Sequence, residues 1–140
     1  MNGVIYTTGN FTVDVTDESS IFQACYWTGK VRTALYSPVG SGARVYGITV
    51  VNGNVYTAEG TKACYWTGTS CTDLGRPAAT EFERQTITLV NGTVYTGGEY
   101  YNPVTGDIRP CYWTGTLFKD PYPSILVKTN YILGIFVDIK

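Results

Sequence analysis

Few side chains in this 140-residue sequence have the types needed for catalysis, because it contains no histidine. Nucleophile systems of the usual Ser/His/Asp or Cys/His kind are therefore excluded. Two carboxylate pairs, Glu81 with Glu83 and Asp17 with Glu18, are close in sequence, but both stand in polar stretches typical of solvated loops. Asp14, Asp17 and Glu18 do not have the spacing of an EF-hand calcium loop. We predict no enzyme activity, no metal and no cofactor.

The four cysteines are better explained by packing than by reactivity. No CxxC spacing occurs, so a zinc site is not expected. Cys25, Cys64 and Cys111 each open the sequence CYWTG, and a thiol at such a shared position typically behaves as a small buried hydrophobe. Cys71 differs, because a two-residue turn at Thr67-Gly68 would place it opposite Cys64. A Cys64–Cys71 disulfide therefore remains an open alternative.

Composition excludes several classes of partner. The chain is 44% hydrophobic and 15% charged, its formal net charge is −1, and its many Val, Thr and Tyr residues favour β-structure. No cluster of Lys and Arg is present, so we expect no nucleic-acid partner. No apolar run approaches the roughly 18 residues of a membrane span, and no signal peptide is recognisable. We expect a soluble, cytoplasmic protein, with secretion left open if the sequence has been trimmed.

An internal repeat is the strongest pattern in the sequence, and it must position any side chains that act in function. A motif opened by Asn-Gly precedes each CYWTG motif, and 23 residues separate the last Gly of CYWTG from the next Asn-Gly in both cases. Asn-Gly between two β-branched runs is the strongest short-range signal for a hairpin. The copies are NGVIYT from Asn2, NGNVYT from Asn52 and NGTVYT from Asn91, followed by CYWTG at Cys25–Gly29, Cys64–Gly68 and Cys111–Gly115.

Each repeat is predicted to contain four short antiparallel strands. Strand A precedes Asn-Gly, strand B follows it, strand C carries CYW, and strand D follows the Thr-Gly turn. Residues 131–138 are expected to form one more strand A, so the chain starts on a B without its A and ends on an A without its B. The predicted repeats are 2–44, 45–84 and 85–130, with strands A at Val45–Val51 and Gln85–Val90 and strands B at Asn54–Ala58 and Thr93–Gly97.

The V-NG-x-V-Y pattern, followed by YW and a Gly-containing turn, resembles the kelch-like β-propeller repeats of about 40–50 residues. The resemblance implies an all-β fold of three four-stranded blades in a single domain. Propellers have about 4–8 blades, so we expect two chains to exchange strands and form a six-bladed homodimer. The alternative is a monomeric β-trefoil, which also contains three four-stranded repeats.

The same repeat separates structural residues from candidate ligand contacts. Identity in all three copies predicts that Trp27, Trp66 and Trp113, together with Cys25, Cys64 and Cys111, pack between sheets. Variable stretches such as 10–23 and 99–109 are predicted to be loops on one face, where binding sites concentrate. The candidate small-molecule, glycan or peptide contacts on these connections are Arg44, Arg84, Glu99, Tyr100, Tyr101, Asp107, Arg109 and Tyr122.

The sequence thus predicts a non-enzymatic β-propeller scaffold that binds a ligand or another protein. A trefoil-type carbohydrate-binding module is the second candidate. A propeller enzyme that uses carboxylates such as Glu99 and Asp107 at the channel mouth is the third.

Overall fold

The computed structural model describes residues 3–13, 21–36, 43–60, 63–75, 81–121 and 134–138, with the backbone alone at residues 13, 21 and 81–84. The described chain is all-β and forms three antiparallel sheets. No helix in these ranges is long and apolar enough to cross a membrane. The strands are β1 (Tyr6–Val13), β2 (Ile21–Thr28), β3 (Val31–Leu35), β4 (Val45–Val51), β5 (Asn54–Glu59), β6 (Cys64–Thr67), β7 (Ser70–Asp73), β8 (Glu81–Val90), β9 (Thr93–Asn102), β10 (Asp107–Thr114) and β11 (Leu117–Lys119).

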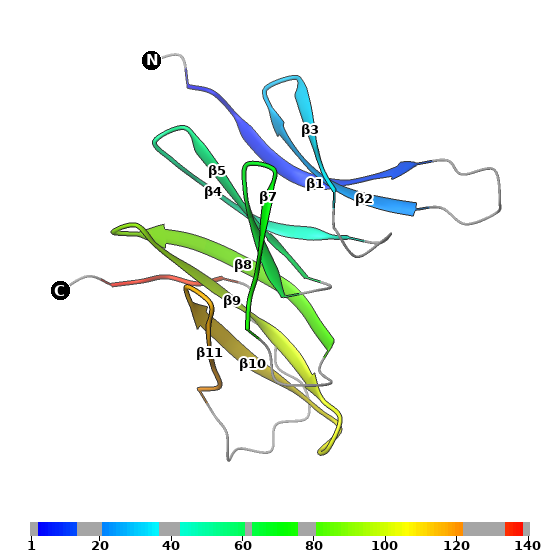
Figure 1. Cartoon of the computed structure of the whole chain (residues 1–140), viewed down its shortest axis with the longest axis vertical. Helices are drawn as coiled ribbons and strands as arrows, with labels where there is room; N and C mark the ends of the chain where they lie inside the picture. The colour runs from blue at the N-terminus through cyan, green and yellow to red at the C-terminus, as the bar shows by residue number, and fades with distance from the viewer. Residues whose placement is uncertain are drawn as a thin grey trace.

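Each sheet is a meander of consecutive strands. Sheet 1 has the order β1-β2-β3, sheet 2 the order β4-β5-β6-β7, and sheet 3 the order β8-β9-β10-β11. The pairing agrees with the predicted order of strands A to D, including the first group of B, C and D alone. Figure 1 shows the three sheets fanned out in sequence order. The first strands of the sheets neighbour one another, because β4 contacts both β1 and β8.

The CYW strands sit in the same register in all three sheets. The tryptophan of each motif stands opposite a threonine of the preceding strand: Thr7 opposite Trp27, Thr57 opposite Trp66, and Thr96 opposite Trp113. Side chains alternate between the two faces of a strand. Each tryptophan therefore faces the same side of its own sheet, with the tyrosine before it on the other side.

Positive φ angles fix both kinds of hairpin turn. Asn52 and Gly53 have φ of 51° and 78°, as a type I′ turn requires. In the second hairpin of sheet 2 only Gly68 is positive, at 58°, so the turn is Gly68-Thr69 and not the predicted Thr67-Gly68. The register therefore moves, and Cys64 lies opposite Asp73 instead of Cys71. No disulfide joins the four cysteines, all of which lie in described parts of the chain.

Several predicted loops are wrong because the strands extend further than expected. β9 and β10 continue outward to a short turn at residues 103–106, so most of the predicted loop 99–109 is a hairpin arm. β1 reaches Val13 and β2 begins at Ile21, so both ends of the predicted loop 10–23 are strand. β8 begins four residues before the predicted strand 85–90. The polar composition of these segments does not predict strands. They form strands because hydrogen bonds to a neighbouring strand and burial of one face stabilise them.

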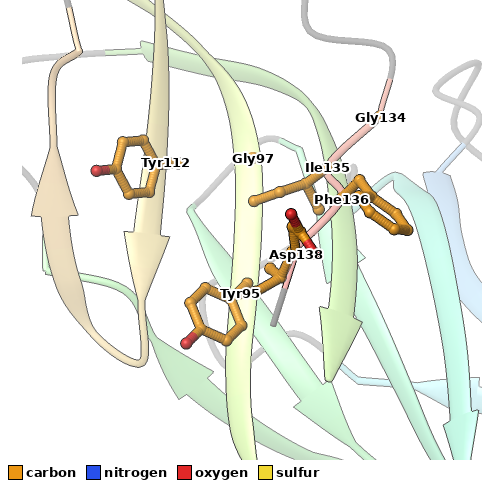
Figure 2. Close-up of a pocket in the computed structure, with 8 residues that line it drawn as sticks. Tyr95, Gly97, Tyr112, Gly134, Ile135, Phe136 and Asp138 are labelled. Atoms are coloured by element: carbon orange, nitrogen blue, oxygen red, sulfur yellow. The ribbon is translucent and has the colours of Figure 1, made fainter. Parts of the chain in front are cut away.

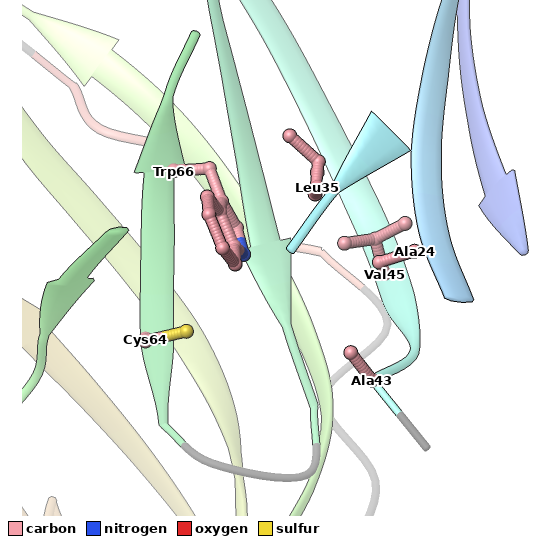
Figure 3. Close-up of a cluster of buried hydrophobic side chains, with 6 residues drawn as sticks. All are labelled: Ala24, Leu35, Ala43, Val45, Cys64 and Trp66. Carbon is pink, nitrogen blue, oxygen red and sulfur yellow. The ribbon is translucent and has the colours of Figure 1, made fainter. Parts of the chain in front are cut away.

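The core lies in the two joints between sheets. Figure 3 shows one cluster at the joint of sheets 1 and 2, which joins Ala24 and Leu35 to Ala43, Val45, Cys64 and Trp66. The joint of sheets 2 and 3 holds two clusters, one around Trp113 and Leu74 and one of Ala58, Ile87 and Val94. The backbones come close at Gly47, where an added Cβ would lie 3.0 Å from Ile87 N and Thr86 Cα. Sheets 2 and 3 are therefore packed closely, face against face.

Residues 134–138 lie outside all three sheets. The predicted closing strand, 131–138, is thus not paired over the residues that are described, and its first three residues fall outside them. The segment nevertheless lies against sheet 3 and lines a pocket with Tyr95, Gly97 and Tyr112. Its exposure alternates, with Ile135 and Val137 half-buried and Phe136 exposed, as for a strand that lies on another sheet.

Candidate functional site

Three polar side chains of sheet 3, and a fourth from the residue that follows its last strand, gather at the end of that sheet remote from the Asn-Gly turn. The Tyr100 hydroxyl donates a 2.7 Å hydrogen bond to Asp120 Oδ2. The Arg109 guanidinium lies 3.6 Å from Asp107 Oδ2 and 3.8 Å from Asp120 Oδ2. Tyr100, Asp107 and Arg109 are buried. We call Tyr100, Asp107, Arg109 and Asp120 the polar cluster.

Long strands position this cluster. Tyr100 on β9 stands opposite Arg109 on β10, so both side chains project from the same face of sheet 3. That face is turned towards sheet 2, because Tyr100 packs in one cluster with Ala63 and Leu74. The Tyr100 ring also meets Phe118 edge to face at 5.6 Å. The polar cluster is therefore seated on the apolar joint between sheets 2 and 3.

Four of the eight predicted ligand contacts are not exposed. Glu99, Tyr100, Asp107 and Arg109 were expected on an open loop but are buried strand residues, and this prediction of their exposure is wrong. Glu99 stands opposite Pro110 and so projects from the other face of the sheet from Tyr100. The pairing of β9 with β10 beyond Gly98 is the physical reason. Sequence composition alone does not separate such a hairpin arm from a loop.

The other predicted contacts lie elsewhere. Arg44 is exposed, and its guanidinium carbon lies 5.0 Å from the centre of the Phe22 ring, a cation–π arrangement. Tyr101 is 42% exposed at the far end of β9. The Arg84 side chain and all of Tyr122 lie outside the described residues. The structure therefore brings Tyr100, Asp107 and Arg109 together but does not join Arg44 to them.

Sequence reasoning missed one buried acid, Glu59. It is fully buried on β5, and its Oε2 lies 3.1 Å from Cys64 Sγ and 3.3 Å from Trp66 Nε1, each of which donates to it. Glycines occupy the corresponding places in the other sheets, Gly9 opposite Cys25 and Gly98 opposite Cys111. The departure from glycine at this one position was the signal available in the sequence.

The residues shared by the three motifs are packing residues where a neighbouring sheet covers them. Trp66 and Trp113 are 1% and 0% exposed, and Trp113 Nε1–H donates to the carbonyl oxygen of Gly75 at 2.8 Å. Cys25, Cys64 and Cys111 are buried. Burial raises the pKa of each of these thiols, which leaves them protonated and poorly nucleophilic at neutral pH.

Within the described ranges, no group of three or more His, Cys, Asp or Glu side chains is placed to hold a metal ion. The pocket beside residues 134–138 has a volume of about 420 Å³ and is lined by Tyr95, Gly97 and Tyr112 on sheet 3. The sequence matches no protein-family model and no curated protein at a significant level. The function is therefore inferred from the fold and from these sites.

Tyr100 should ionise late, and the stability of the protein should reflect this. Burial raises the pKa of Tyr100 to about 12 from 10.0, and the hydrogen bond to Asp120 adds to the shift. Between these two pH values the unfolded chain loses this proton while the native chain keeps it, so stability should fall as pH rises. Below them the contribution is fully present. Urea unfolding of wild type and Tyr100→Phe across this interval measures the effect.

The wild-type protein should lose more stability across that interval than Tyr100→Phe does. Tyr101→Phe removes the neighbouring exposed tyrosine and is the matched control, because it should follow wild type. Equal losses in wild type and Tyr100→Phe would contradict the assignment.

Proposed function

We propose that this chain is a non-enzymatic scaffold of the β-propeller type, which binds its ligand through the loop ends of its sheets. Hydrogen bonding within each meander supports this reading over the trefoil, whose repeats contribute strands to a shared barrel. In the described residues each repeat keeps its strands in one sheet, and the sheets pack face to face with their first strands adjacent. That arrangement is the one expected of propeller blades.

The observation that carries the proposed function is the division between shared and unshared residues. Side chains common to the motifs, such as Trp66 and Trp113, are buried by packing between sheets. Exposed unshared side chains, such as Arg44 and Tyr101, stand at the strand ends remote from the tight Asn-Gly turns and from the turns at the last Gly of each CYWTG. Variable residues on a rigid scaffold are the usual place for recognition.

The carboxylates do not favour the enzymatic alternative. Asp107 lies against Arg109, while Glu99 is buried on the opposite face of sheet 3. A pair of carboxylates that share a substrate would need both groups on one accessible surface. Asp107 and Glu99 do not share one accessible surface, so binding remains the function that the geometry supports best.

A binding assay on loop-face variants tests the proposal. We expect a glycan array and a random peptide library to yield a ligand whose affinity falls by about tenfold or more in Arg44→Ala or Tyr101→Ala. Lys30→Ala, an exposed change at the opposite turn, is the control and should bind as wild type does. A ligand whose affinity falls with Lys30→Ala and not with the other two would place recognition on the wrong face.

A further inference from the structure

Three positions suggest that both outer faces of the fan are halves of one further joint. Val55 and Val94, each the apolar residue after Asn-Gly-x, are both 7% exposed, because each faces the preceding sheet. Ile5 holds the same place in NGVIYT and is 73% exposed. Among the described residues, no other sheet packs on the face of sheet 1 on which Ile5 lies, although Cys25 on that face is 0% exposed.

The tryptophans of the motif repeat this contrast. Trp66 and Trp113 are buried against the preceding sheet, but Trp27, in the same register on sheet 1, is only half-buried. Its exposure therefore follows from the missing neighbour and not from its residue type. Ile5 and Trp27 share one face, because Ile5 precedes Thr7 by two residues and Thr7 stands opposite Trp27.

Sheet 3 presents the complementary half. In sheet 2 the residues Tyr56, Ala58 and Tyr65 form one apolar cluster with Ile87 and Val94 of sheet 3. The equivalent positions on sheet 3 are Tyr95, Gly97 and Tyr112. The register is the same, because Ala58 pairs with Tyr65 in sheet 2 as Gly97 pairs with Tyr112 in sheet 3. These three residues line the pocket of about 420 Å³.

Residues 134–138 occupy part of this outer surface in the way that β8 occupies the surface of sheet 2. Figure 2 shows Ile135 directed towards Gly97 on β9, the place that Ile87 takes beside Ala58 at the inner joint. No described side chain takes the place of Val94 there, and the pocket lies beside Ile135. Phe136 projects away from β9 in Figure 2 and is 90% exposed.

We propose that the pocket on sheet 3 receives Ile5 of a second copy of this chain. This proposal rests on the propeller-type scaffold proposed above. Residues 134–138 of one copy would pair with β1 of the other, and Phe136 would then lie beside the partner's Tyr6, as Thr88 lies beside Tyr95 within the chain. Two such joints close six sheets into a ring with two-fold symmetry, within the usual range of about 4–8 blades.

The complementarity is apolar and specific to a copy of this chain. Ile5 and Phe136 are large exposed hydrophobic side chains on opposite ends of the fan, at 73% and 90% exposure. At the inner joint of sheets 2 and 3 the equivalent surfaces pack against each other, with Val94 and Ile87 beside Ala58. Pairing β1 with residues 134–138 would also cover the open backbone edge of sheet 1, a common route to association. A small-molecule ligand of the pocket would leave Ile5 and Trp27 exposed.

The mass in solution, measured by light scattering over a range of concentrations, tests the assembly. We expect wild type to be a dimer and Ile5→Asp to raise the dissociation constant by at least about 100-fold, because a charge would enter each of two apolar joints. Ile5→Val supplies the residue found at Val55 and Val94 and should remain dimeric. Val31→Asp is the matched control on sheet 1 and should remain dimeric. Val31 is 67% exposed, and Leu117, which has the same position in the last hairpin of sheet 3, is 58% exposed.

A second variant guards against misfolding of the first. Deletion of residues 129–140 removes the segment 134–138 that would pair with β1 of the partner, and it should give a monomer whose near-ultraviolet circular dichroism remains that of packed tryptophans. A wild-type monomer, a trimer or filament, or an Ile5→Asp dimer would overturn the proposed joint. A folded wild-type monomer that still binds its loop-face ligand would overturn the joint alone. A wild-type dimer that binds no loop-face ligand would count against the scaffold function instead.

Discussion

Replacing Trp113 with Ala should lower the free energy of unfolding by about 3–5 kcal/mol, the usual cost of truncating a fully buried tryptophan. Trp113 is 0% exposed and packs against Leu74 and Cys111. Its ring also meets Phe118 edge to face at 5.5 Å. The substitution would open a cavity in the joint of sheets 2 and 3 and leave the carbonyl oxygen of Gly75 without the indole donor. Urea denaturation followed by circular dichroism measures the change.

Trp27→Ala provides the matched control for this prediction. Trp27 has the same place in its motif but is half-buried, so its truncation should cost clearly less within a single chain. Both substitutions should be compared in the Ile5→Asp background, in which the chains are expected to stay apart. Equal losses of stability for Trp27→Ala and Trp113→Ala would contradict the explanation by sheet-to-sheet burial.

Replacing Glu59 with Ala should lower the free energy of unfolding by about 2–4 kcal/mol, because two buried donors lose their acceptor at once. The indole N–H of Trp66 and the thiol of Cys64 both donate to Glu59 Oε2. Glu59 is 0% exposed, so both hydrogen bonds are shielded from bulk water. The loss should be visible in urea denaturation at neutral pH.

Glu59→Gln separates the acceptor from the rest of the side chain. Its amide oxygen can accept the same two hydrogen bonds, so it should retain more stability than Glu59→Ala. Glu59→Ala as stable as wild type would show that the carboxylate contributes nothing to the joint of sheets 1 and 2. A Gln variant no better than Ala would show that hydrogen-bond acceptance is not what Glu59 provides.

Local turn chemistry explains why the strand pattern could be predicted. Asn52-Gly53 and Asn91-Gly92 have positive φ at both residues, which few other residue pairs adopt, and the strands on either side follow from that turn. The prediction of strand A at Val45–Val51 is confirmed. The predicted turn at Thr67-Gly68 is one residue too early. The observed turn at Gly68-Thr69 pairs Cys64 with Asp73, so Cys71 does not lie opposite Cys64. Register is set by the turn, so a small error there changes every pair.

The candidate contacts were less predictable, because burial of a polar residue depends on what lies over it. Tyr100 and Arg109 have the composition of a binding loop, yet β9 and β10 pair along their whole length and carry them into a joint. Arg44 and Tyr101, with similar composition, stay exposed. The difference comes from partners far away in the sequence, such as Leu74 and Ala63.

The sequence by itself determined the β class, the hairpins and the three equivalent packing positions, because each depends on local dihedral preference and on alternation along a strand. Only the tertiary structure decided which of those equivalent positions are buried. Ile5 and Val94 are alike in the sequence but differ in exposure, 73% against 7%, because one faces a neighbouring sheet and the other does not. Burial is a property of two surfaces that meet, and no single strand carries that information.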